Sequence, residues 1–267
     1  YEISCSLVGS EMCIRDSKLA AICRKAAMHL VSEDVKQIRI TEKELKDYLG
    51  APRYYPERQA LEERVGVVNG LAWTSVGGEL LEVEVNVVPG TGKVELTGNL
   101  GDVMKESAHA ALSFIRSQAD RLGIQGDFYQ SKDIHVHFPE GAVPKDGPSA
   151  GIAITTAMVS ALTGAPVKRG LAMTGEVTLR GRVLPIGGLR EKSMAAYKNG
   201  MKTVIIPHGN IADLAEVDQV VKDNVRFVPV RRIDEVLPIA MPGLLNRETK
   251  PNTPCPEPAH GVQTLRQ

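Results

Sequence analysis

Ser149 stands in the segment PKDGPSAG (144–151), where a Gly-Pro pair leads into an apolar, helix-like run. Backbone N–H groups at the start of a helix have no intrahelical partner and carry a partial positive charge. Such a position can activate a hydroxyl and offer hydrogen bonds to a developing oxyanion. Serine is also a preferred N-cap residue. The segment therefore allows either a nucleophile or a structural cap.

A serine nucleophile needs a general base, because its hydroxyl reacts poorly at neutral pH. Lys192 is the best candidate, since in the helical pattern 189–200 it flanks the stripe of small and apolar residues and points away from the charged arc. Burial disfavours the charged form of lysine and can lower its pKa by several units. A neutral amine could then accept the serine proton. The alternative is a lysine that extends to the surface or pairs with Glu191.

Two histidines offer a rival arrangement. His135 and His137 lie two residues apart in a strand-like run, so both project from one face. Either could complete a Ser–His–Asp triad with Ser149 and Asp146, or the pair could bind zinc. A zinc site needs a third protein ligand, and no residue with metal-ligand spacing accompanies the pair. We therefore expect no metal.

The stretch VVPGTGKVELTG (87–98) imitates a phosphate-binding loop. The P-loop pattern requires glycine where Val87 stands and serine or threonine where Val94 stands. The flanking residues are apolar and β-prone, which predicts a hairpin rather than a strand that enters a helix. The sequence thus predicts no nucleotide site.

The candidate residues need a framework that brings them together, and the hydrophobic pattern predicts one of mixed α/β class. Helical spacing or capping signals predict helices over 18–31, 42–49, 102–122, 149–162, 189–199, 211–217 and 233–239. Apolar runs between turn residues predict strands over 65–74, 78–88, 93–98, 133–139, 171–179, 181–187, 202–207 and 225–230. Strands and helices alternate in the second half, so we expect a mixed α+β fold.

Changes in composition divide the chain into five parts. The first lacks any periodicity and resembles translated adapter sequence or a disordered end, the second is a helical segment, and the third is a linker rich in proline, tyrosine and charge. The main domain and a proline-rich tail, which we expect to be disordered, follow. The five ranges are 1–17, 18–50, 51–64, 65–242 and 243–267.

The composition excludes several classes of protein. Hydrophobic residues make up 43% and charged residues 24%, as in soluble globular proteins, and the 32 basic residues balance the 32 acidic ones. This balance gives no support for binding to nucleic acid or to a membrane surface. The four cysteines lie near the two ends without CxxC spacing, so a reducing cytoplasm is the expected setting. We expect no membrane span and no secretory signal.

Three segments resemble the active-site signatures of the Lon protease family: PKDGPSAG around Ser149, TGE at 174–176, and LRGRVLPIGGLREK, which ends at Lys192. The resemblance extends from the helix near Lys18 to about Pro238, without an obvious gap. Motifs of this length and order rarely coincide by accident.

The resemblance implies a Ser–Lys dyad. Ser149 would attack the scissile carbonyl, and Lys192 would take the hydroxyl proton and return it to the leaving amine. Thr174 would orient the lysine amine, Glu176 would help to shape the site, and Asp146 would hold the lysine in an inactive, regulated arrangement. The N–H of Ser149 would stabilise the oxyanion.

The resemblance also implies a molecular context. Residues 65–242 would be the Lon-type proteolytic domain, and 18–50 would be a remnant of the helical subdomain of an AAA+ ATPase. ATP and Mg²⁺ would bind to an ATPase module that this chain lacks, with no cofactor here. The whole protein would form a homohexameric ring that degrades unfolded or damaged proteins in the cytoplasm. A competing hypothesis is a catalytically silent scaffold module.

Overall fold

The computed structural model describes residues 10–32, 37–41, 44–50, 63–74, 77–139 and 141–244. Near the N-terminus, α1 (Ser10–Ser32) and α2 (Leu45–Leu49) contact each other, and the Lys25 ammonium donates a hydrogen bond to the Asp47 carbonyl. The helix α1 begins earlier than the expected start at residue 18. Most of the predicted linker and nearly all of the predicted tail lie outside the described residues.

The main domain is built on a seven-stranded sheet in the order β3-β4-β2-β1-β5-β8-β9. The four strands β1, β5, β8 and β9 run parallel to one another, whereas β2 is antiparallel to both of its neighbours. A two-stranded sheet pairs β6 with β7. The strands are β1 (Val67–Thr74), β2 (Gly77–Pro89), β3 (Val94–Thr97), β4 (Lys132–His137), β5 (Leu171–Met173), β6 (Glu176–Val177), β7 (Val183–Leu184), β8 (Thr203–Pro207) and β9 (Arg226–Val230).

The predicted hairpin at 87–98 is wrong, because β4 lies between β2 and β3. The β4 strand pairs antiparallel with β2 and parallel with β3, so it supplies backbone partners to both. The intervening glycine-rich loop does not close a tight turn. Instead, the Thr91 and Lys93 amides both donate to the Asp133 carboxylate at the start of β4.

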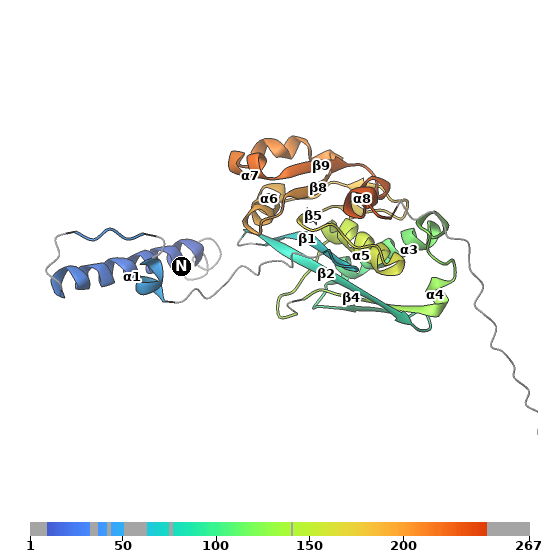
Figure 1. Ribbon diagram of the computed structural model, residues 1–267, viewed down its shortest axis with the longest axis horizontal. Coiled ribbons are helices and arrows are strands. Elements are labelled where there is room, and N and C mark those ends of the chain that lie inside the picture. The colour runs from blue at the N-terminus through green and yellow to red at the C-terminus, as the bar shows by residue number, and fades with distance from the viewer. Residues whose placement is uncertain are drawn as a thin grey trace, which may run out of the picture.

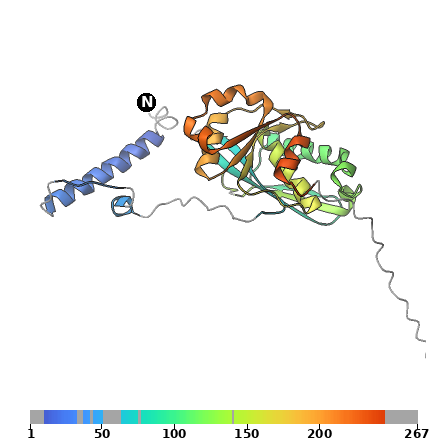
Figure 2. The same cartoon turned by 45° about the horizontal axis from the view of Figure 1, so that its top comes forward.

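Helices cover both faces of the sheet, which confirms the mixed α/β class (Figures 1 and 2). One face packs against α3 (Asp102–Ser117), α5 (Gly151–Thr163) and α8 (Ile233–Ala240), and the other against α6 (Leu189–Lys198) and α7 (Gln219–Asn224). The alternation of strand residues fixes this division. In β8, Ile205 belongs to the first cluster, whereas Val204 and Ile206 belong to the second.

Several predicted elements are shorter or broken in the structure. A four-residue helix, α4 (Phe128–Ser131), and short 3₁₀ turns supplement the main elements. The predicted helix at 211–217 is a 3₁₀ turn over Ala212–Glu216. The predicted strand at 171–179 splits into β5 and β6. The Thr174 amide still donates to the Ile205 carbonyl of β8, but the Gly175 backbone bonds to Ser149 and Ile152 at the entry to α5 instead of to a strand.

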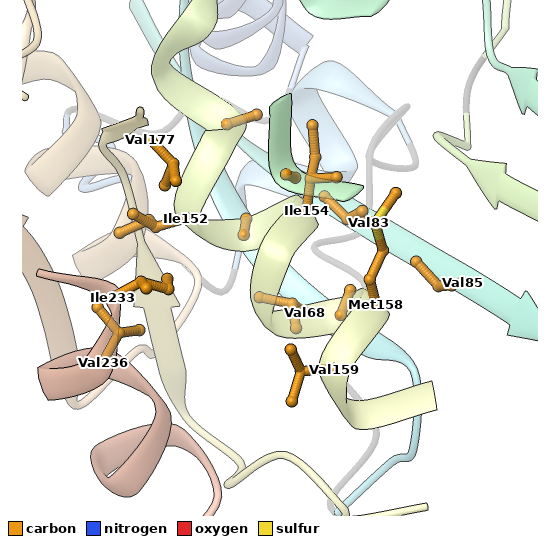
Figure 3. Close-up of a cluster of buried hydrophobic side chains, with 14 of the residues drawn as sticks. Val68, Val83, Val85, Ile152, Ile154, Met158, Val159, Val177, Ile233 and Val236 are labelled. Atoms are coloured by element: carbon orange, nitrogen blue, oxygen red, sulfur yellow. The ribbon is translucent and has the colours of Figure 1, made fainter. Parts of the chain in front are cut away.

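The central element of the core is α5, in which every residue from Gly151 to Ser160 is buried. Figure 3 shows its side chains between the strands and α8, with Ile152 near Ile233 and Met158 near Val85. A helix that is apolar on all sides must be covered on all sides. The residue that precedes it, Ala150, is buried as well, whereas the segment that leads into Ala150 is exposed or half-buried.

Among the described residues, no helix combines the length and hydrophobicity needed to cross a lipid bilayer.

Candidate active site

Ser149 lies at the entry to α5, in a 3₁₀ turn over Pro148–Ala150. Neither this turn nor α5 has a hydrogen bond from a capping side chain. The N-cap alternative for Ser149 is therefore wrong: its hydroxyl, half-buried, makes no hydrogen bond to any other described residue. The hydroxyl remains available for chemistry beside the N–H groups of the first turn.

The Thr174–Gly175 pair holds the backbone of Ser149 in place. The Ser149 carbonyl accepts hydrogen bonds from the Gly175 amide at 2.8 Å and from the Thr174 hydroxyl at 3.3 Å. The Gly175 carbonyl in turn accepts from the Ile152 amide at 3.0 Å. Three hydrogen bonds thus tie the end of β5 to the first turn of α5. Their geometry turns the Ser149 carbonyl toward Thr174.

Lys192 projects from α6 into the interior and is only 3% exposed. Its amine donates a hydrogen bond to the Thr174 hydroxyl, at 3.2 Å. The alternatives of a surface lysine or an ion pair with Glu191 are therefore wrong, since among the described residues Lys192 forms no ion pair. The Thr174 hydroxyl accepts from Lys192 and donates to the Ser149 carbonyl, so a single side chain joins the two candidate residues.

Burial lowers the pKa of Lys192 from 10.5 to about 8. The cause is loss of hydration, which disfavours the ammonium form. At pH 7 roughly a tenth of such amines are neutral, against well under 0.1% for an exposed lysine. The amine donates one N–H to Thr174 and, in its neutral form, has a lone pair for another proton.

The two candidate residues come from opposite layers of the molecule. Ser149 leads into α5 on one face of the sheet, and Lys192 lies on α6 on the other face. They can meet only beyond the end of a strand. Thr174 directly follows β5, at the edge where the parallel strands end, and this is the common place for active sites in α/β sheets.

Asp146 lies beside Ser149 in sequence but contacts another element. Its carboxylate accepts hydrogen bonds from the Met104 amide at 3.0 Å and from the Gly147 amide at 2.9 Å. Met104 is the third residue of α3, so Asp146 caps that helix. Among the described residues, no ion pair joins Asp146 to Lys192.

Glu176 is half-buried at the start of β6, two residues after Thr174. It pairs with Leu184 of β7 through the backbone. Its carboxylate has no ion pair with Lys192 in the part of the chain that the structure describes. Glu176 is therefore close to the site in sequence but, among the described residues, forms no ion pair that would stabilise the charged form of Lys192.

The structure brings the two histidines together at a different place. Thr97 Oγ1 lies 2.8 Å from His135 Nε2 and 2.7 Å from His137 Nδ1. Neither ring bonds to Ser149, and Asp146 is engaged by α3, so the Ser–His–Asp triad is not assembled. No group of three or more His, Cys, Asp or Glu side chains within the described residues could hold a metal ion.

In the loop that imitates a P-loop, the Asp133 carboxylate lies where a phosphate would have to bind. The Lys93 and Thr91 amides bond to the Asp133 carboxylate, which lowers the pKa of that carboxyl group. A Cβ atom at Gly90 would lie 2.1 Å from the same carboxyl group. A phosphate would have to displace this anion, so these residues do not fit a nucleotide.

Sequence reasoning missed the part played by Gly175. Its N–H and C=O bond to the Ser149 and Ile152 backbones, which no side-chain pattern reveals. The available signal was that TGE interrupts an apolar strand-like run with glycine.

Comparison with known proteins shows which family the chain is similar to. Residues 39–243 match the family model of the Lon protease (S16) C-terminal proteolytic domain. The chain is 56% identical over 227 residues to Lon protease of Erwinia amylovora, 54% over 227 to that of Escherichia coli (strain K12), and 53% over 228 to Lon protease 1 of Bacillus subtilis (strain 168).

Each of these alignments covers 85% of the chain but only 29–30% of the relative. The chain thus spans less than a third of the length of the curated relatives it matches. The matched part holds the sheet, both helical layers and the Ser149–Thr174–Lys192 arrangement. The chain belongs to the Lon protease family and contains its C-terminal proteolytic domain.

Proposed function

We propose that this chain hydrolyses peptide bonds, with Ser149 as the nucleophile and Lys192 as the general base. The observation that carries the proposal is the buried Lys192 amine, bonded to the same threonine hydroxyl that bonds to the Ser149 carbonyl. A lysine whose pKa lies near 8 can act as a base close to neutral pH. The serine hydroxyl has no competing structural role.

In the proposed reaction, Ser149 Oγ attacks the carbonyl carbon while its proton passes to Lys192 Nζ. The oxyanion that forms is stabilised by the N–H groups at the entry to α5, chiefly that of Ser149. The Lys192 ammonium then returns the proton to the leaving amine, and the C–N bond breaks. Lys192 then takes a proton from water, the hydroxide attacks the acyl-enzyme, and the ammonium gives this proton to Ser149 Oγ as the ester C–O bond breaks.

The supporting residues have distinct proposed roles. Thr174 orients the lysine amine, and Glu176 shapes the edge of the site. Asp146 has its carboxylate on the N-terminus of α3, which favours a role in anchoring the segment that leads to Ser149. A regulatory contact between Asp146 and Lys192 would require release of the Met104 amide.

The wider context follows the relatives, which are named Lon protease. We propose that the complete protein takes unfolded or damaged proteins as substrates, acts as an oligomeric ring in the bacterial cytoplasm, and depends on an ATPase module that binds ATP and Mg²⁺. We propose no nucleic acid or membrane partner for this domain.

The test is hydrolysis of an unstructured, fluorogenic polypeptide by the wild type, Ser149→Ala and Lys192→Ala. We expect each variant to lose roughly 10³-fold or more of the activity, because nucleophile and base act as a unit. Lys198→Ala is the matched control, since Lys198 lies on the same helix with its side chain exposed. Equal rates in all four proteins would favour a silent scaffold module instead.

A further inference from the structure

The first turn of α6 is enclosed by a pair of residues from the β1–β2 ladder. Trp73 of β1 and Gly78 of β2 are directly opposite each other in the antiparallel register. Directly opposed residues point to the same face of a sheet. Two residues earlier in β1, Leu71 faces Leu80, and both belong to the cluster that packs against α6. Trp73 and Gly78 therefore face α6 as well.

Gly78 meets the backbone of α6 at the residue that carries the base. A Cβ atom at Gly78 would lie 2.0 Å from the Glu191 carbonyl oxygen and 2.9 Å from the Lys192 amide nitrogen. These are backbone atoms of a helix and cannot rotate away as a flexible side chain could. Only a residue without a side chain permits this approach.

Trp73 covers the other end of the same turn. A Cβ atom at Gly188 would lie 2.9 Å from Trp73 Cγ, and Gly188 has φ +68°, a conformation that favours glycine. The Lys192 amide donates to the Gly188 carbonyl at 3.0 Å, which closes the first turn of α6. Trp73 and Gly78 thus contact the two ends of one hydrogen-bonded turn, and Lys192 is part of it.

We propose that Trp73 and Gly78 are positioning residues for the general base. Their contacts fix the position of the first turn of α6, and so hold the Lys192 amine within hydrogen-bond distance of Thr174. The inference rests on the proposed function for its catalytic meaning. Trp73 is 62% exposed, more than a tryptophan that merely fills the core. Its contact with Gly188 is a structural reason for a large aromatic side chain at this exposed position.

A side chain at residue 78 should displace the turn and weaken the Lys192–Thr174 hydrogen bond. Water would then reach the amine, and its pKa would rise from about 8 toward 10.5, since burial alone lowers it. No charged side chain contributes to that lowering. Misplacement of a reacting group by about 1 Å can cost roughly 100-fold in rate.

The experiment uses Gly78→Ala and Trp73→Ala, with Gly126→Ala as the matched control. Gly126 has open space around it and an ordinary φ. The first readout is the pKa of Lys192. It is measured by NMR on protein labelled with ¹³C-lysine, in which the signal of Lys192 is assigned by its absence from Lys192→Met. The second is the rate at which a fluorophosphonate probe labels Ser149, measured as a function of pH. Thermal unfolding establishes that each variant folds.

We expect the pKa of Lys192 to rise in Gly78→Ala and Trp73→Ala, and the labelling of Ser149 to slow roughly 10- to 100-fold. Gly126→Ala should behave like the wild type. Trp73→Ala alters an exposed side chain, so it keeps the test valid should Gly78→Ala not fold. A wild-type pKa and labelling rate in the folded variants would overturn the proposal. If the pKa moves but even the wild type is not labelled at Ser149, the positioning holds and the proposed hydrolase function fails.

Discussion

At the scale of single residues, the proposed chemistry rests on one hydroxyl that has two hydrogen-bond partners. Thr174 accepts from the Lys192 amine and donates to the Ser149 carbonyl, and its side chain is fully buried. A hydroxyl can serve both purposes because it has one donor and two acceptor positions. Thr174 is therefore the side chain that joins Lys192 to the backbone of Ser149.

Replacement of Thr174 by valine keeps the shape but removes the hydroxyl. The Lys192 amine would lose its hydrogen-bond partner, and the Ser149 carbonyl would keep only the Gly175 amide. We expect kcat to fall roughly 10- to 100-fold with little change in KM, because the proposed base would be misplaced while the surface that binds the substrate would be unchanged.

Thr174→Ser is the matched control, since it restores the hydroxyl without the methyl group and should recover most of kcat. Measurement of both kinetic constants on a peptide substrate checks the prediction. A Thr174→Val enzyme with unchanged kcat would show that the hydroxyl does not orient the base.

At the scale of elements, α3 and the segment before Ser149 are joined by Asp146. Its carboxylate caps the third residue of α3 and also bonds to the Gly147 amide. A negative charge at a helix N-terminus interacts favourably with the exposed amides and the helix dipole. This contact connects two segments that are more than 40 residues apart in sequence.

Asp146→Ala should therefore lower the free energy of unfolding by about 1 kcal/mol, the usual loss for a helix cap. Asp146→Asn should cost less, because the amide oxygen can still accept from Met104. Urea denaturation of the three proteins measures the difference. If Asp146→Ala is as stable as the wild type, the cap contributes nothing, and the regulatory role implied by the family resemblance would become the better account of Asp146.

At the scale of the whole molecule, Lys192 opposes folding as long as it is charged. Its folded pKa, about 8, lies below the unfolded value of 10.5. The unfolded chain therefore binds more protons between these two values, and the stability of the wild type rises with pH across that window. Below pH 8 the burial of the ammonium costs at most about 3 kcal/mol.

Lys192→Met should thus be inactive but more stable than the wild type. We expect an increase of up to about 3 kcal/mol at pH 7, which shrinks as the pH rises from 8 and disappears above 10.5. Methionine fills a similar volume without a charge. Lys198→Met, at an exposed position of the same helix, is the control that should change little.

Urea denaturation at pH 7 and at pH 10 gives the comparison. A Lys192→Met variant that is less stable at pH 7 would mean that the contacts of the amine outweigh its lost hydration. The buried core around α5, seen in Figure 3, contributes stability that can offset the free energy lost by burying the Lys192 ammonium.

The sequence by itself determined the class of fold, most elements, and the identity of Ser149, Lys192 and Thr174 as candidates. These follow from local signals: apolar runs, helical spacing, glycine turns and the motifs shared with the family. The helices carrying Lys192 and following Ser149 agree with the predicted ranges within one to two residues.

Only the tertiary structure decided what depends on contacts between distant segments. The insertion of β4 between β2 and β3, the capture of Asp133 by a loop that imitates a P-loop, and the capping of α3 by Asp146 leave no trace in local periodicity. The same is true of the meeting between α5 and α6 across the end of β5, and of the contact of Gly78 with α6. Burial and close approach are properties of packed layers, so a pattern along one segment cannot specify them.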